Sequence, residues 1–273
     1  MSYRSAYSNT KNWNAIDTNI RLVRNGKFTR NGNKFIGFLK RNNVHTIIRY
    51  YASSRRSKTV TKEEVRVYSD EGFYFLPVYQ DRARQTSDFG LSNGRRAASH
   101  ALDFVDYVGQ PDGTTIFFAV DTDFSESKVK KYVVPYFEGL HEKLGDRFRI
   151  GAYGGGSTMK VLMSKKLITL PWLSESRGFS GTEKYFNSKK WVLRQIPPDQ
   201  MHSGISYDKN EMVISPEEIG AFKFGDKPVA LKETKDTKIP KKTGYKSGNV
   251  EEATEVREPT GFAEETFKDL LQE

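Results

Sequence analysis

The chain contains no cysteine among its 273 residues, so disulfide bonds, thiolate metal sites and cysteine nucleophiles are excluded. It has only four histidines, and their spacing fits neither a metal site nor a Ser-His-Asp arrangement. The first predicted strand, AIDTNI, lacks the following Gly-x-Gly turn of a dinucleotide site. From these absences we expect neither a metal nor a cofactor to take part in the chemistry of this protein.

Long hydrophobic runs are also missing. No apolar stretch approaches the roughly 18 residues that a membrane span requires. The opening residues likewise lack the apolar run of a cleaved signal peptide. We therefore expect no membrane span, and synthesis in the cytoplasm without a signal peptide.

Charge is abundant and unevenly placed, with a formal net charge of +10. Residues 221–273 hold 10 basic and 11 acidic side chains, so the positive excess lies in residues 1–220. A basic surface attracts polyanions, and nucleic acid, anionic bacterial envelope polymers and acidic phospholipid are all compatible with it. A surface that serves only solubility is the alternative.

Short β-rich runs alternate with helical patterns from Ala15 to about Tyr207, which is typical of βα units around a parallel sheet. The predicted helices lie near 33–43, 61–71, 92–108, 125–144 and 157–166. The predicted strands are 15–20, 45–51, 73–79, 114–120, 148–156, 168–174, 190–196 and 204–210. This pattern predicts an α/β fold, a modified TIM-type (β/α) barrel of about eight strands with helices mainly in the first half. A doubly wound open sheet is the structural alternative.

Three helix signals are specific enough to test. Thr61 begins a TKEE capping box, and Ser92 is placed to cap the helix that continues to about Val108. Pro135 lies inside the predicted helix 125–144, where we expect a kink or a break.

The composition predicts three segments. Residues 1–12 form an N-terminal arm, 13–219 the barrel, and 220–273 a polar, flexible tail. The tail ends in a sequence that would make a docking helix for a protein carrier, with Phe262, Phe267, Leu270 and Leu271 on one face. A frayed terminus is the alternative.

Four aspartates are predicted at the carboxyl ends of strands, where active sites of parallel α/β folds lie: Asp17, Asp121, Asp123 and Asp208. Neighbouring carboxylates cannot all ionise freely, so one should have a raised pKa. Such a carboxyl can donate a proton near neutral pH, as glycoside cleavage requires. Alternatively, the Asp-x-Asp pair binds a divalent metal, or Asp17 and Asp208 merely cap turns.

Several motifs in order resemble one family. AIDTN, RYY, FFAVDTD, PYFEGLHEKLGDRFRIGAYGGG, PWLSES, WVLRQ and YDKN, spread over about residues 13–213, resemble the glycoside-hydrolase-like domain long classified as a domain of unknown function, family 1906. That family is similar in turn to the family 25 lysozymes, whose barrel has five βα units and three barer strands. The resemblance implies a site for bacterial peptidoglycan.

The resemblance also implies roles for the aspartates. Asp123 would be the general acid, at a position where the related lysozymes carry a glutamate. Asp121 would orient an acetamido group or act as base, and Asp17 and Asp208 would tune pKa values and hold the sugar.

Other side chains near predicted strand ends are candidates for stacking and hydrogen bonding to a sugar. They are Tyr50, Tyr79, Tyr153, Trp172 and Gln195. Core packing is the alternative for each, and Arg49 and Glu175 could form a buried ion pair.

The sequence thus predicts a glycosidase-like protein that acts on cell-wall polysaccharide. The alternatives are a non-catalytic glycan-binding barrel and the carbohydrate-active part of a phage component or of an effector delivered by a secretion system. We do not expect nucleic acid as a partner. A wall-directed protein made in the cytoplasm would act outside after release or injection.

Overall fold

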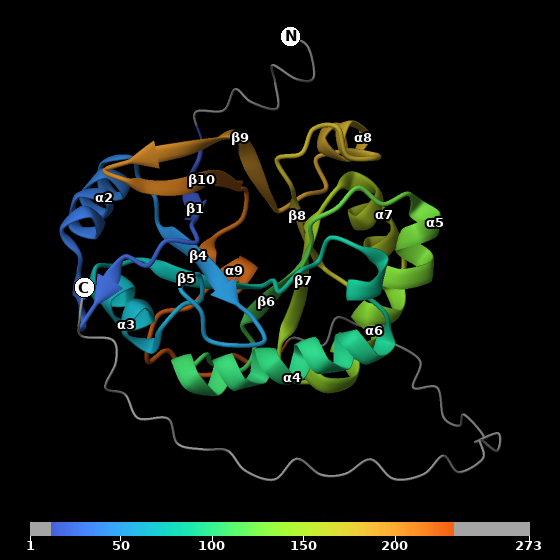
Figure 1. Ribbon diagram of the computed structural model, residues 1–273, viewed down its shortest axis with the longest axis horizontal. Coiled ribbons are helices and arrows are strands. Elements are labelled where there is room, and N and C mark those ends of the chain that lie inside the picture. The colour runs from blue at the N-terminus through green and yellow to red at the C-terminus, as the bar shows by residue number, and fades with distance from the viewer. Residues whose placement is uncertain (1–11, 232–273) are drawn as a thin grey trace, which may run out of the picture. The chain divides into compact units, whose positions relative to one another are not determined.

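The computed structural model of the protein describes residues 12–231, in which eight strands close into a barrel (Figure 1). Their order around the barrel is β1-β10-β9-β8-β7-β6-β5-β4. They are β1 (Ala15–Asp17), β4 (Thr46–Tyr51), β5 (Tyr74–Tyr79), β6 (Thr115–Val120), β7 (Arg149–Gly154), β8 (Leu170–Leu173), β9 (Leu193–His202) and β10 (Ile205–Met212). The predicted barrel of about eight strands is confirmed, and the open sheet is excluded.

The last strand closes the barrel in the opposite direction. Strand β10 runs antiparallel to both of its neighbours, β9 and β1, whereas β1 pairs in parallel with β4. The pairing of β1 with β10 places Asp17 directly opposite Asp208. The first and last strands therefore meet at the predicted aspartates.

The helices cover the barrel unevenly. The long ones belong to the first half: α2 (Arg30–Arg41), α3 (Lys62–Asp70), α4 (Leu91–Val108), α6 (Val134–Leu144) and α7 (Gly156–Ser164). Later strands have only the short α8 (Thr182–Asn187) and α9 (Pro216–Ile219). The remaining small elements are a hairpin of β2 (Val23–Arg24) and β3 (Lys27–Phe28), a 3-10 turn η1 (Thr86–Asp88), and α5 (Glu126–Lys128). Helices mainly in the first half were predicted, and this is confirmed.

The helix signals had different outcomes. The Thr61 capping box is present, with reciprocal bonds between Thr61 and Glu64. The Ser92 cap is wrong: α4 begins at Leu91, and Gly90 is its cap with φ 103°, a conformation that favours glycine. Pro135 causes no break. A π-helical turn, η2 (Val129–Val133), precedes it, so the proline stands in the first turn of α6, where its missing N–H is tolerated.

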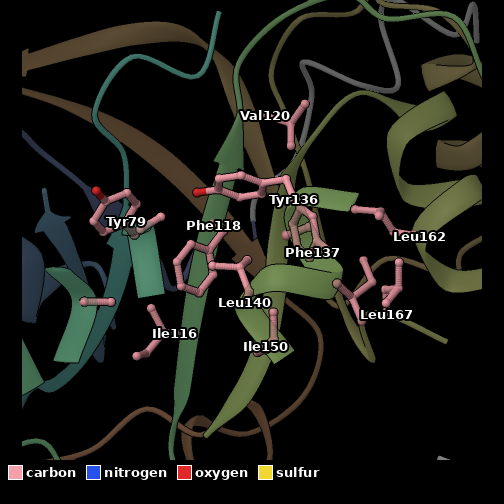
Figure 2. Packing of buried hydrophobic residues seen from close by; sticks show 14 of the residues in the cluster. Tyr79, Ile116, Phe118, Val120, Tyr136, Phe137, Leu140, Ile150, Leu162 and Leu167 are labelled. Carbon is pink, nitrogen blue, oxygen red and sulfur yellow. The ribbon is translucent and has the colours of Figure 1, made fainter. Parts of the chain in front are cut away.

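Strand β6 is buried on both faces, and its neighbouring phenylalanines belong to different layers. Phe118 lies in the outer cluster between strands and helices, with Tyr136 and Phe137 of α6 (Figure 2). Phe117 lies in the cluster inside the barrel, where its ring centroid is 5.6 Å from that of Trp172. The core thus consists of a filled barrel and a second apolar layer around it.

Helices α4 and α6 approach closely through two glycines. A Cβ atom on Gly94 would lie 2.0 Å from the Tyr136 carbonyl oxygen, and one on Gly139 would lie 2.4 Å from that of Leu91. Neither distance is compatible with a side chain, so these glycines allow the two helix backbones to touch.

Arg49 forms a buried ion pair, but not with Glu175. Its Nη1 donates to Glu64 Oε1 at 2.6 Å, and both side chains are fully buried. Arg49 also donates to the carbonyl oxygens of Ile20 and Lys58. The pair thus joins the start of α3 to β4 and its flanking loops. The expected Arg49–Glu175 pair is wrong, because Glu175 follows β8 at the mouth of the barrel.

Packing continues beyond residue 219, where the sequence placed the end of the barrel. Phe222 is 1% exposed and exchanges two backbone hydrogen bonds with Phe75, of 2.8 and 3.0 Å. The predicted N-terminal arm, apart from residue 12, and the predicted docking helix lie outside the described residues. Between residues 12 and 231, no helix is long and apolar enough to cross a membrane.

Candidate active site

Five of the predicted site residues converge at one mouth of the barrel. Asp17 is the last residue of β1, while Tyr50 and Tyr153 are the second-to-last residues of β4 and β7. Gln195 and Asp208 come from β9 and β10. Hydrogen bonds between their side chains link all five into one network.

Asp17 is the buried centre of this network and is only 1% exposed. Its Oδ1 accepts from the Tyr50 hydroxyl at 3.1 Å, and its Oδ2 accepts from Gln195 Nε2 at 3.1 Å and from Asn210 Nδ2 at 2.8 Å. Burial raises the pKa of Asp17 to about 6, against the opposing effect of these three hydrogen bonds. All three hydrogen bonds favour the charged form of Asp17.

Asp208 lies beside Asp17 in a less favourable environment for charge. Gln195 Nε2 donates to its Oδ2 at 2.9 Å, and its buried Oδ1 has no hydrogen-bond partner among the described residues. Burial raises the pKa of Asp208 to about 9, with further contributions from the negative charges of Asp17, Asp199 and Glu175. Of the two neighbouring carboxyls, Asp208 is therefore the one that holds a proton more tightly.

Glu175, expected from the sequence only as a partner of Arg49, is a further member of the site. It stands two residues beyond the end of β8, and its backbone N–H donates to Gln195 Oε1 at 3.4 Å. Burial and the charges of Asp199 and Asp17 raise its pKa to about 7. Glu175, Asp199 and Asp208 each present an oxygen within 4.8 Å of the others, a spacing at which a hard cation could also bind.

Asp121 lies at the edge of the same mouth. Its Oδ2 accepts from Gln80 Nε2 and from the Arg84 guanidinium, each at 3.3 Å. Its side chain remains 23% exposed. The negative charges of Asp17, Asp208 and Asp121 all act on the Tyr50 hydroxyl and raise its pKa, after the larger effect of burial. Asp121 therefore belongs to the site, as an ion-paired and accessible carboxylate.

Asp123 points elsewhere. It is exposed, and its Oδ1 accepts a hydrogen bond of 2.7 Å from the backbone N–H of Ser180. It thus joins the loop after β6 to the loop before α8, and the structure does not connect it to the network of Asp17 and Asp208. The expected alignment of Asp121 and Asp123 fails because the chain leaves β6 at Val120 and is no longer extended.

Two predicted sugar contacts are core residues. Tyr79 lies in the outer apolar layer near Phe118 (Figure 2), and its hydroxyl donates to Asp81 Oδ2 at 2.9 Å. Trp172 points into the barrel but is 2% exposed, with Nε1 donating to Asn210 Oδ1 at 2.9 Å. Trp172 therefore supports the network from below and has no face free for a sugar.

Two residues of the site that were not predicted can nevertheless be recognised from their positions in the sequence. Asn210 is two positions after Asp208 on β10, so the two side chains share a face. Glu175 directly follows a predicted strand, as Asp121 does. Asp199 had no such signal, because its position depends on the extension of the β9–β10 hairpin beyond the predicted strands.

Comparison with known proteins agrees with this fold. The family model of the Rv2525c-like, glycoside hydrolase-like domain matches residues 38–215, and the chain belongs to this family. The resemblance inferred from the sequence motifs is thereby confirmed.

Individual relatives show how far the similarity extends. The uncharacterized protein YbfG of Bacillus subtilis (strain 168) is 29% identical over 190 residues, which is 63% of this chain and 26% of YbfG. The chain thus spans about a quarter of this curated relative.

Among solved structures, the Tat-secreted protein Rv2525c of Mycobacterium tuberculosis in complex with L-tartrate has a TM-score of 0.62 at 20% identity, over 76% of this chain and 97% of that one. A family 25 glycosyl hydrolase from Bacillus anthracis has a TM-score of 0.46 at 13% identity, over 76% and 93%. Membership of the family and the closed ring of eight strands together show a glycoside hydrolase-like barrel.

Proposed function

We propose that this protein is a glycosidase that binds and cleaves bacterial cell-wall polysaccharide, peptidoglycan, at the mouth of its barrel. Family membership and the basic charge of residues 1–220 support an anionic envelope glycan as ligand. Such a substrate lies outside the cytoplasm, so the proposal includes release or delivery of the protein.

The observation that carries the proposal is the different environment of two adjacent carboxyls. Burial and the neighbouring negative charges raise the pKa of Asp208 further than that of Asp17, so Asp208 is the carboxyl of the pair that holds a proton and Asp17 the one that carries the charge. Carboxyls whose pKa values are driven apart in this way divide acid and base roles between them. Glycoside cleavage needs a protonated carboxyl for the leaving oxygen and a carboxylate for the positive charge that develops on the sugar.

Burial assigns the individual roles. Asp17 is too buried to touch a sugar, so we assign it as a positioning residue: after burial, its charge contributes most to the raised pKa of Asp208. Asp208 is the general acid, and the neighbouring Glu175 supports it. Asp121, accessible and held by Arg84, is the carboxylate that stabilises the sugar cation or activates water.

The release of reducing ends from purified peptidoglycan tests this assignment. We expect Asp208→Asn to lower the rate about 10²- to 10⁴-fold, the usual contribution of a general acid. Asp123→Asn should leave the rate within about twofold of wild type. The matched control is Asp70→Asn, a change of an exposed aspartate at the end of α3, at the opposite end of the barrel; it should have as little effect.

Three results would contradict parts of the proposal. If Asp123→Asn abolished cleavage and Asp208→Asn did not, the general acid would be Asp123. A wild-type protein that binds the glycan but releases no reducing ends would be a non-catalytic glycan-binding barrel. Absence of both binding and cleavage would exclude peptidoglycan.

A further inference from the structure

A pocket of about 390 Å³ opens beside the carboxyls, at the same end of the barrel. It is lined by Lys58, from the loop after β4, and by residues between Gln80 and Asp88, from the loop after β5. Arg82 and Arg84 are among them. The pocket therefore combines three cationic side chains next to a site made of carboxyls.

The acidic residues in this pocket are already engaged within the protein. Asp81 accepts from the backbone and hydroxyl of Ser53 and from the Tyr79 hydroxyl, at 2.9 to 3.0 Å. Asp88 Oδ2 accepts from the backbone N–H groups of Arg84 and Gln85, each at 3.0 Å. These bonds hold the two loops, and Asp81 is also paired with Arg56 at 3.2 Å, so both acids are committed to contacts within the protein.

The cations are only partly compensated. Arg82 is exposed and forms no ion pair with any residue between 12 and 231. Arg84 pairs with Asp121 but remains 75% exposed. Lys58 is half-buried, and burial together with the positive charges of Arg56 and Arg84 lowers its pKa. An anion in the pocket would relieve this repulsion.

Two contacts connect the pocket to the carboxyl network. Lys58 Nζ stands 5.3 Å from the centre of the Tyr50 ring, whose hydroxyl binds Asp17. Gln80 donates from its side chain to Asp121, and its backbone oxygen accepts from Lys58 at 2.7 Å. The cations and the carboxyls are therefore neighbours, and a ligand that spans them would have a neutral part at the carboxyls and an anionic part at the cations.

We infer that this pocket is a subsite for an anionic substituent, a carboxylate or a phosphate, carried by the sugar next to the bond at the carboxyl cluster. The inference rests on the proposed glycan site and specifies its substrate class. Lysine and arginine form charge-assisted hydrogen bonds with both kinds of anion. Without such cations, an anionic glycan would be repelled by the carboxylates of the site.

Binding of three glycans of equal length, measured by calorimetry, tests the inference. They are a neutral N-acetylglucosamine oligomer, an alternating N-acetylglucosamine and N-acetylmuramic acid oligomer with free carboxylates, and a neutral oligomer bearing one phosphate. We expect wild-type protein to bind at least one anionic glycan about tenfold more tightly than the neutral one, and the tighter of the two identifies the anion. High salt should reduce this preference.

Variants of the pocket test whether the preference for the anionic glycan depends on its cations. Two variants should lose the preference for the anionic glycan: Arg82→Gln, and the double variant Lys58→Gln with Arg82→Gln. Both should bind the neutral glycan as wild type does. Lys165→Gln, at the end of α7 on the opposite side of the barrel, is the matched control and should retain the preference. Melting temperatures establish that each variant is folded.

The outcomes separate the two proposals. Equal affinity of wild type for neutral and anionic glycans would overturn the subsite and leave the glycan site in place. If both variants kept the preference for the anionic glycan, the anion would bind elsewhere, and this result would also overturn the subsite. If no glycan bound at all, the proposed function would fail and the subsite with it.

Discussion

Asp17 and Asp208 lie opposite each other on β1 and β10, and a single nitrogen, Gln195 Nε2, donates to both. Since the two accepting oxygens lie within 3.1 Å of that nitrogen, they are at most about 6 Å apart. Two negative charges at this separation in a buried site repel strongly. A proton on Asp208 removes the repulsion.

The stability of the protein should depend on the ionisation of Asp208. Its pKa is raised from 3.8 to about 9, so the folded state binds the proton more tightly than the unfolded chain does. The resulting stabilisation is complete below about pH 4 and is lost as the pH rises towards 9. Asp208→Asn cannot ionise, so its melting temperature should exceed that of wild type increasingly from pH 4 to pH 9.

Thermal unfolding of both proteins at several pH values measures this difference. Asp70→Asn serves as control, because an exposed aspartate should show no such widening. A constant difference between Asp208→Asn and wild type would mean that Asp208 is charged throughout this range.

The hydroxyl of Tyr50 should hold down the pKa of Asp17. It donates to Asp17 Oδ1 and so favours the charged carboxylate. In Tyr50→Phe we expect the pKa of Asp17 to rise above its value of about 6. Carbon-13 NMR titration of the aspartate carboxyls measures the shift, and an unchanged Asp17 titration would show that the bond does not form in solution.

The strand ends could be predicted from the sequence, but the directions of side chains within the strands could not. Asp17, Tyr50, Tyr153, Gln195 and Asp208 do meet. A strand buried on both faces has no polar and apolar alternation to show which residues point inward. FYFLPVY is such a strand, so the sequence could not decide between a sugar contact and core packing for Tyr79, and the structure places it in the core.

The paths of the loops could not be predicted from the sequence either. Asp123 follows β6 by only three residues, but it turns to the backbone of Ser180, a partner 57 positions away. Glu175 lies beside Asp208 because of the path of the loop after β8, and Asp199 because β9 continues beyond its predicted end. Such paths result from packing between distant segments, which no local pattern encodes.

Removing one member of the buried Arg49–Glu64 ion pair should destabilise the protein strongly. Glu64→Gln leaves the Arg49 charge without its partner in a fully buried site. We expect the free energy of unfolding to fall by about 3–5 kcal/mol. Denaturant unfolding checks this, with Glu63→Gln as the matched control, since Glu63 is exposed. Equal effects of the two changes would mean that the pair contributes little.

The contact between α4 and α6 should not tolerate a methyl group. In Gly94→Ala the new Cβ would lie 2.0 Å from the Tyr136 carbonyl oxygen, so the helices must separate. We expect a loss of about 1–3 kcal/mol in the free energy of unfolding, typical of overpacking. Gly178→Ala, where a Cβ meets nothing within 4 Å, is the control and should change it little.

The position of β10 between β9 and β1 has a consequence for biosynthesis. Asp17 is among the first residues of the barrel to leave the ribosome, but its partner Asp208 is on the last strand. Chains begin to fold from the N-terminus while they are being made. No partly synthesised chain can therefore carry the complete set of carboxyls, and chemistry at this mouth begins only when the final strand has closed the ring.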